Sequence, residues 1–324
     1  MRFIFIILLV GFSFISNAQH RFSKEFSLIS DNDLYTSIHR DGYYTNGLFL
    51  TYRIVKNDAS ENVPKRIFKF QVGQLMFTAL RANIQTASLH DRPFAGYLYG
   101  SFGISRFYNS NNILSTDIEV GVIGPSANGK ELQNFLHGFY NFPEPLGWKH
   151  QIHNAFAINL NASYLHHFSK ISDDNFDISS YNSFKAGTIF TNLSTGIYSR
   201  IGFKKLQSLN NSVAFNSNLN IESKSYSESF VFVKPMLNYA LYDATVQGSF
   251  LNKSSPVTYD VMPFHFSLEL GYRYYKKRFL YGYTYTYHTK KLKSDRIKKS
   301  NTYPIKTTNL RHSRACQRIS TKAI

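Results

Sequence analysis

The sequence of 324 residues has a single cysteine, Cys316, and a single tryptophan, Trp148. One cysteine cannot form an internal disulfide, and it cannot build a cysteine-based zinc site. A disulfide scaffold and a zinc finger are therefore both excluded. After residue 15 no apolar run is long enough to span a bilayer as a helix, which takes about 20 residues. The chain is therefore not a bundle of membrane helices.

Aromatic residues are abundant instead. The chain has 23 Tyr and 29 Phe, whereas charged residues make up only 18% of it. Aromatic and β-branched residues favour the pleated surface of a sheet. The mean hydropathy is nonetheless negative, at −0.27. This combination indicates a sheet whose two faces meet different solvents.

The N-terminus has the three parts of a secretory signal peptide. Arg2 provides a positive start, residues 3–15 form an apolar run, and Ser16-Asn17-Ala18 is a small-residue exit. We predict a signal peptide over residues 1–18 with cleavage near Ala18, so the mature chain leaves the cytoplasm. An uncleaved N-terminal anchor is the alternative.

The net charge of +17 is concentrated at the C-terminal end. From Lys290 onward, eleven Lys or Arg stand against one acid, Asp295, so this tail carries +10 and the rest of the chain +7. A secreted chain rarely meets nucleic acid, and we expect no nucleic-acid partner. A basic surface could meet lipid phosphates, although solvated surface charge is the commoner explanation.

Several segments alternate with period two over about ten residues, as the strands of membrane β-barrels do. In residues 267–275 Leu and Tyr share one face, and in residues 279–289 the tyrosines do so again. A soluble sandwich would use mostly Val, Ile and Leu on that face, whereas tyrosine suits the headgroup girdles of a barrel. Backbone groups in a bilayer have no water to bond, so such a sheet must close. The sequence predicts an all-β, antiparallel transmembrane β-barrel.

Eleven candidate strands can be placed, near residues 24–30, 44–55, 67–77, 94–108, 114–123, 152–168, 179–190, 193–203, 228–242, 263–275 and 278–290. Bacterial barrels have an even number of strands, so we expect about twelve, within a barrel over residues 19–290. The last should follow residue 290, but the basic tail 291–324 contains Pro304 and no sustained alternation. The final strand is therefore doubtful. We expect an altered or degenerate end after about Tyr303 to compromise closure and insertion.

Three polar clusters interrupt this barrel pattern. They are Asn32-Asp33 with Tyr43-Tyr44-Thr45-Asn46-Gly47; His90-Asp91-Arg92-Pro93-Phe94-Ala95-Gly96; and residues 121–138, GVIGPSANGKELQNFLHG, followed by Glu144 and Gly147-Trp148. In this order and spacing they resemble the outer-membrane lipid A 3′-O-deacylase family, over about residues 24–290. The sequence of residues 241–259 also resembles sequences of that family.

The resemblance implies a calcium-dependent, twelve-stranded barrel in the outer membrane of a Gram-negative bacterium. Such a barrel hydrolyses the ester-linked acyl (acyloxyacyl) group at the 3′ position of lipid A. By motif match, His137 falls on the family's catalytic histidine and Thr45 on its threonine. Asn32 and Asp33 fall on its Asn-Asp pair.

Two further residues are candidates from the same resemblance. The family's substrate-binding lysine has no counterpart before the second cluster, and Arg81 is the nearest cation. Glu144 is the nearest candidate for the acid that follows the histidine, and we expect it to bind the metal with Asp33.

The residues themselves agree with ester hydrolysis. No Gly-x-Ser-x-Gly elbow is present, and Ser126 does not fit one. An activated water is therefore the economical nucleophile, and a histidine can take its proton. Ca²⁺ prefers oxygen ligands and could polarise the ester. Our hypothesis makes His137 the general base, with Asn32 helping to hold the carbonyl oxygen and Thr45 completing the site from the facing strand. Asp33 binds or supports the metal.

Each residue also has an ordinary structural explanation. A lone histidine is usually solvated or hydrogen-bonded, Asn32-Asp33 could be a turn or cap, and Thr45 could be a plain strand residue. Asp91-Arg92 is expected to be a structural ion pair or turn, and Trp148 an interface anchor.

Two other functions remain open: a non-catalytic porin or scaffold barrel, and a phospholipase barrel with a serine nucleophile. The expected partners are lipid A or lipopolysaccharide and outer-membrane lipids, and the chain is expected to be a monomer.

Overall fold

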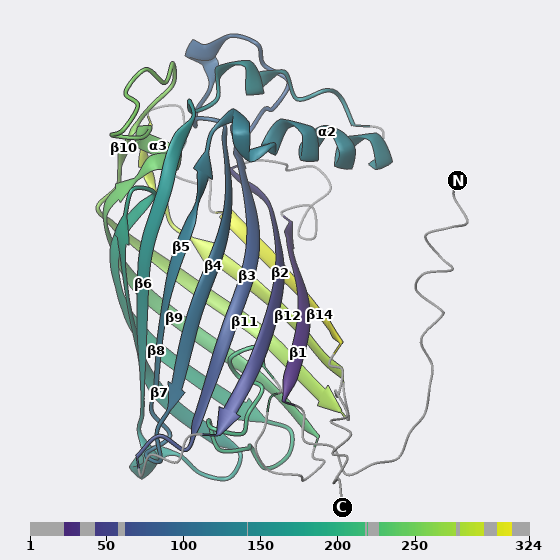
Figure 1. Ribbon diagram of the computed structural model, residues 1–324, viewed down its shortest axis with the longest axis vertical. Coiled ribbons are helices and arrows are strands. Elements are labelled where there is room, and N and C mark those ends of the chain that lie inside the picture. The colour runs from purple at the N-terminus through teal and green to yellow at the C-terminus, as the bar shows by residue number, and fades with distance from the viewer. Residues whose placement is uncertain are drawn as a thin grey trace, which may run out of the picture.

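Twelve strands of the described chain form one closed antiparallel barrel in this computed structural model (Figure 1). The structure describes residues 23–32, 43–57, 62–140, 142–217, 219, 227–276, 279–294 and 303–312, with only the backbone of 139, 140 and 303–312. The predicted signal peptide, residues 1–18, and the candidate residue Asp33 lie outside the described residues.

Each barrel strand pairs with its neighbour in the sequence, and the last pairs with the first. The barrel strands are β1 (Lys24–Asn32), β2 (Tyr43–Asn57), β3 (Lys65–Thr78), β4 (Ala95–Phe107), β5 (Ile113–Ile123), β6 (Ala155–His167), β7 (Phe176–Gly187), β8 (Phe190–Gly202), β9 (Glu228–Asp243), β11 (Phe264–Lys276), β12 (Phe279–His288) and β14 (Tyr303–His312). All eleven strands expected from the sequence are therefore confirmed.

The twelfth strand, which the sequence left in doubt, is β14. Its backbone pairs with β12 on one side and β1 on the other, with Asn32 opposite Lys306. The expectation of a compromised closure is therefore corrected. A ladder is made by backbone groups and needs no alternating side chains, and Pro304 lies near the start of the strand, where its missing N–H costs least.

The two faces of the wall have the expected characters. Large apolar side chains such as Val72, Phe102 and Tyr281 are exposed on the outside, whereas Glu25 and Arg200 are buried on the lumen side. The tyrosine face of residues 279–289 therefore lies outward, as predicted. A hydrocarbon solvent outside and a polar lumen inside explain the alternation.

The two ends of the barrel differ in their connections (Figure 1). At one end most turns are short. The other end carries η2 (Ala87–Leu89), η3 (Pro125–Ala127), α2 (Gly129–Tyr140), η4 (Leu146–His150), α3 (Ala244–Gln247) and a small ladder of β10 (Asp260–Val261) with β13 (Leu292–Lys293). Long loops are extracellular and short turns periplasmic in such barrels, which assigns α2 to the outer rim. In the described chain, no helix is long and apolar enough to cross a membrane.

Candidate active site

The ends of β1 and β2 bring two of the predicted residues to the same rim. Asn32 is the last residue of β1 and lies opposite Asn46 of β2. On β1 the exposed Phe26 and Leu28 face outward, and Glu25 and Ser27 are buried on the lumen side. Because side chains alternate along a strand, Asn32 is on the outer face.

A β-bulge places Thr45 on this outer face as well. The register of β2 against β3 shifts between Tyr44 and Asn46, so Thr45 is the extra residue. Its hydroxyl makes a hydrogen bond of 2.7 Å with that of Thr78, at the end of β3. Thr45 and Asn46 are both only 5% exposed. Two adjacent polar residues are thus buried near the rim of the wall.

Helix α2 and the preceding η3 cover the outer face of β3 and β4 at this rim. The Gln74 side chain of β3 donates to the Ala127 carbonyl at 2.6 Å. A Cβ added at Gly96 of β4 would lie 3.2 Å from the Gly129 nitrogen, so the helix start lies directly against the strand. Further along α2, Leu132 and Leu136 pack in a cluster with Met76 of β3. In Figure 1 the helix runs across the rim from this contact.

His137 lies in the last turn of α2 and is 9% exposed. Its Nδ1 donates to the Pro143 carbonyl at 2.8 Å, because a carbonyl can only accept. Its Nε2 is 3.3 Å from the Gln133 amide nitrogen. The Phe142 ring packs edge-on against the imidazole, with the ring centroids 5.5 Å apart.

Gln133 fixes the tautomer of His137. The Trp148 indole N–H can only donate, and it donates to the Gln133 Oε1 at 2.5 Å. The amide nitrogen of Gln133 therefore faces His137 and donates to Nε2. This assigns a neutral imidazole with its proton on Nδ1 and its lone pair on Nε2.

Trp148 is therefore not an interface anchor, and that prediction is wrong. It is 2% exposed, and it packs edge-on against Phe94 with the ring centroids 5.4 Å apart. Its indole is buried because its N–H has a partner in Gln133 and its ring fills the space beside Gly129.

Asp91 and Arg92 hold the first residue of β2. The Tyr43 hydroxyl donates to Asp91 at 2.6 Å, and Arg92 donates to the Tyr43 carbonyl at 2.5 Å and to Thr245 at 2.7 Å. Both side chains therefore hold Tyr43, which agrees with the structural role expected for them. Since Tyr43 comes two residues before Thr45, they also set the start of the strand that carries the site.

Arg81 and Glu144 are both exposed. Arg81 lies in the connection between β3 and β4, and Glu144 directly follows Pro143, whose carbonyl binds His137. Among the described residues no three His, Cys, Asp or Glu gather as metal ligands would. The oxygen atoms at the rim, from Asn32, Thr45 and Glu144, are of the kind that calcium prefers.

The structure thus places Asn32 and Thr45 at the rim of the barrel that also carries α2, the helix of His137. Thr78 carries the bond to Thr45, and Ala79 beside it belongs to the same apolar cluster as Leu136. Gln133 was not identified from the sequence. Its spacing of four residues from His137 on a helix was the available signal, because such residues lie on the same face.

The fold and this rim define a closed membrane β-barrel with candidate polar residues on its outer wall and on a surface helix at the same rim. The sequence matches the family described as outer membrane protein LpxR over residues 3–303. The chain belongs to this family, and the resemblance of its motifs is confirmed.

A solved structure supports the fold. LpxR from Salmonella typhimurium has a TM-score of 0.70 with this chain at 18% identity, covering 89% of this chain and 99% of that one. A bacterial polysaccharide outer membrane secretin has a TM-score of only 0.34 at 6% identity, covering 91% of this chain and 99% of that one. No curated protein matches the sequence.

Proposed function

We propose that the protein is a lipid A deacylase that hydrolyses the ester-linked acyl group at the 3′ position, using a water activated by His137. The observation that carries this proposal is the imidazole of His137. It is 9% exposed in the last turn of α2, with its proton on Nδ1 and its lone pair on Nε2. The family membership and the outer-membrane barrel support lipid A as the substrate.

A site on the outer face of the wall suits a lipid ester. The acyl chain can stay in hydrocarbon while the ester reaches the rim, where water is available. A lumen site would require the chain to leave the bilayer, at a cost of about 0.8 kcal/mol for each CH₂ exposed to water.

The proposed step begins when a water replaces the Gln133 amide at the lone pair of His137 Nε2. This water gives its proton to Nε2 as it attacks the ester carbonyl carbon. The oxyanion that forms is held by polar groups of the rim, to which we assign Asn32 and Thr45. The imidazolium then gives its proton to the sugar oxygen as the C–O bond breaks, which releases a fatty acid. The C-terminal end of α2 favours the positive charge on His137 in between.

Calcium, when bound, would supply positive charge that polarises the ester carbonyl. We propose that Asp33 and Glu144 hold it, with the amide oxygen of Asn32 as a further, neutral ligand. Arg81 is exposed on the same side of the barrel, and we assign to it the contact with a substrate phosphate.

The test uses purified protein in mixed micelles with lipid A. We expect His137→Ala to abolish fatty-acid release while the barrel keeps its heat-modifiable migration on a gel. His150→Ala is the matched control, because His150 is not assigned to the site. Its side chain binds the Gln85 carbonyl, in the connection between β3 and β4, at 2.7 Å. Continued release of fatty acid by His137→Ala would show that another group is the base.

Metal dependence is tested in the same assay. We expect a calcium chelator to stop the release and added Ca²⁺ to restore it, whereas Mg²⁺ should restore it poorly because it demands a stricter octahedral geometry. Full activity in the chelator would remove calcium from the proposal.

A further inference from the structure

The connection between β8 and β9 is long, although it lies at the end of the barrel where the other turns are short. It runs from residue 203 to residue 227. Its described part from Leu206 to Ser217, together with Leu219, is called the plug here. Barrels of eight strands fill their lumen with their own side chains, whereas those of 16–18 strands leave a channel. A twelve-stranded barrel lies between these cases and has room for an inserted segment.

The plug packs inside the barrel against walls on opposite sides. Leu209, Val213 and Leu219 are almost fully buried. They belong to one apolar cluster with side chains from strands spaced around the whole ring. Four of these are Ile67 of β3, Leu165 of β6, Phe230 of β9 and Leu280 of β12. A segment packed into one cluster with inward side chains of these four strands lies inside the lumen.

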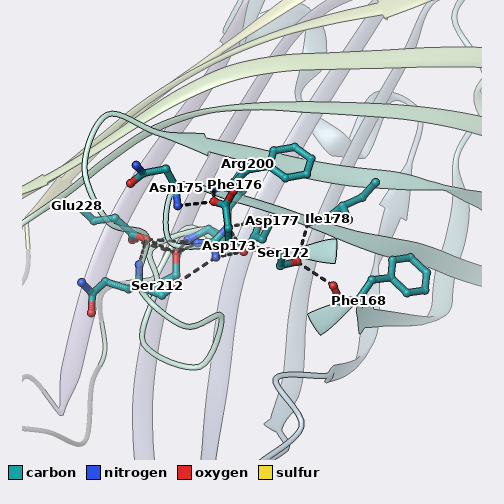
Figure 2. A network of polar contacts seen from close by, with 12 residues as sticks. Phe168, Ser172, Asp173, Asn175, Phe176, Asp177, Ile178, Arg200, Ser212 and Glu228 are labelled. Carbon is teal, nitrogen blue, oxygen red and sulfur yellow. Dashed lines mark hydrogen bonds and ion pairs between the residues drawn. The ribbon is translucent and has the colours of Figure 1, made fainter. Parts of the chain in front are cut away.

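Buried ionic groups hold the plug to β8 and β9 (Figure 2). The guanidinium of Arg200 has no exposed surface and binds Asp177, Ser212 and Glu228. Ser212 donates to Glu228, which also accepts from the Val213 backbone N–H at 2.9 Å. Removal of the plug would take the Ser212 hydroxyl from Arg200 and Glu228 and the Val213 N–H from Glu228. Loss of hydrogen-bond partners is costly for buried charges, so this network favours the plug inside the barrel.

The opposite wall holds the plug through its backbone. Lys65 of β3 donates to the carbonyls of Asn210 and Leu219, the latter at 3.0 Å. The Asn210 side chain donates to the Tyr108 carbonyl at 2.8 Å, in the turn between β4 and β5. The plug is thus attached on both sides of the barrel.

A cavity of about 320 Å³ ends at the plug. The plug residues Ala214 and Phe215 line it, together with charged wall residues that include Lys69 and Lys234. These lysines bind Asp117 at 3.3 Å and Glu269 at 3.0 Å. A polar lumen therefore meets an apolar barrier.

From these contacts we infer that the plug closes the periplasmic end of the barrel, so that the protein conducts no ions through its lumen. The lumen is then a blind chamber. The inference concerns the end of the barrel away from α2, so it stands or falls independently of the proposed deacylase activity.

The experiment records ion current through purified protein in planar bilayers. We expect no stepwise conductance from the wild type, and stepwise conductance from a variant in which a short Gly-Ser turn replaces residues 206–226. Heat-modifiable migration shows that each barrel is folded, and release of fatty acid from lipid A reports separately on the site. Stepwise conductance from the wild type would overturn the inference. A replacement variant that folds but shows no conductance would also overturn it.

A point variant decides the matter if the replacement prevents folding. Val213→Arg places a charge in the apolar cluster and should drive the plug out of the lumen, giving stepwise current. Ser208→Arg adds the same charge at an exposed plug position and should stay silent. Equal behaviour of these two variants would contradict the role of the plug.

Discussion

Replacing Gln133 by Glu tests the assignment of His137 as the base. Gln133 accepts from Trp148 through Oε1 and donates to His137 Nε2 through its amide nitrogen. The substitution keeps the shape and the bond from Trp148 but replaces the donor by a carboxylate oxygen. That oxygen requires a proton on Nε2, while Nδ1 still donates to Pro143. The variant therefore favours the imidazolium, which cannot accept a proton from water.

The size of the effect follows from the contact of 3.3 Å. An opposite charge this close shifts a titration by about one to three units. The acid limb of the profile of kcat/KM against pH should move to higher pH by this amount. At a fixed pH on that limb, deacylation should fall by about 10- to 1,000-fold, which corresponds to about 1.4–4 kcal/mol.

The assay measures fatty-acid release from lipid A micelles across a range of pH. Gln133→Met is the matched control, because it removes both hydrogen bonds without adding charge. We expect it to lower activity by about tenfold at every pH, from the loss of two bonds worth roughly 0.5–1.5 kcal/mol each. Identical profiles for Gln133→Glu and Gln133→Met would refute the assigned tautomer.

Two further predictions follow from other parts of the structure. Thr45→Val should reduce deacylation by about 100-fold, as loss of one oxyanion donor does. Thr78→Val is the control, because it also breaks the hydrogen bond between the Thr45 and Thr78 hydroxyls, and it should leave more activity. Equal losses of activity in the two variants in the lipid A assay would remove Thr45 from the site. Burial lowers the pKa of Lys291 from 10.5 to about 8, Arg92 and Lys185 act in the same direction, and Asp243 opposes them. The unfolded chain then binds the extra proton between pH 8 and 10.5, so stability rises with pH across this window. Lys291→Met should stabilise the fold at pH 7 by up to about 3 kcal/mol, which a higher unfolding temperature would show. This gain should shrink towards pH 10.5. The exposed Lys293→Met should change the unfolding temperature at neither pH.

The strands of the barrel wall could be predicted almost completely from the sequence, because the two faces of each strand contact different environments. Hydrocarbon outside and a polar lumen inside impose an alternation that is legible in a single strand, as in residues 267–275. The last strand escaped this reasoning. Its pairing depends on backbone groups of β1 and β12, which no local pattern of residues 303–312 reveals.

The candidate site was less accessible from the sequence. The motif resemblance selected Asn32, Thr45 and His137, but it did not say that Asn32 and Thr45 lie on the outer face of the wall or that His137 lies on a helix at the same rim. Trp148 was assigned to the membrane interface because tryptophan is common there. Its actual place depends on a donor–acceptor match with Gln133 and on the space beside Gly129, and both arise only when the third cluster folds onto β4.

The bulge at Thr45 explains how a regular wall can carry this site. Without it, strict alternation would turn Thr45 and Asn46 to opposite faces, one to the lumen and one to lipid. The extra residue lets Tyr44 stay on the lumen side, where its hydroxyl donates to Asp31 at 2.9 Å. Thr45 can then reach Thr78 on the outer face. Bulges concentrate beside active sites because they redirect one side chain without disturbing the ladder beyond. Deleting Thr45 should restore plain pairing of β2 with β3 and remove deacylation while the barrel still folds, and an active deletion variant would show that the outer-face site does not depend on the bulge.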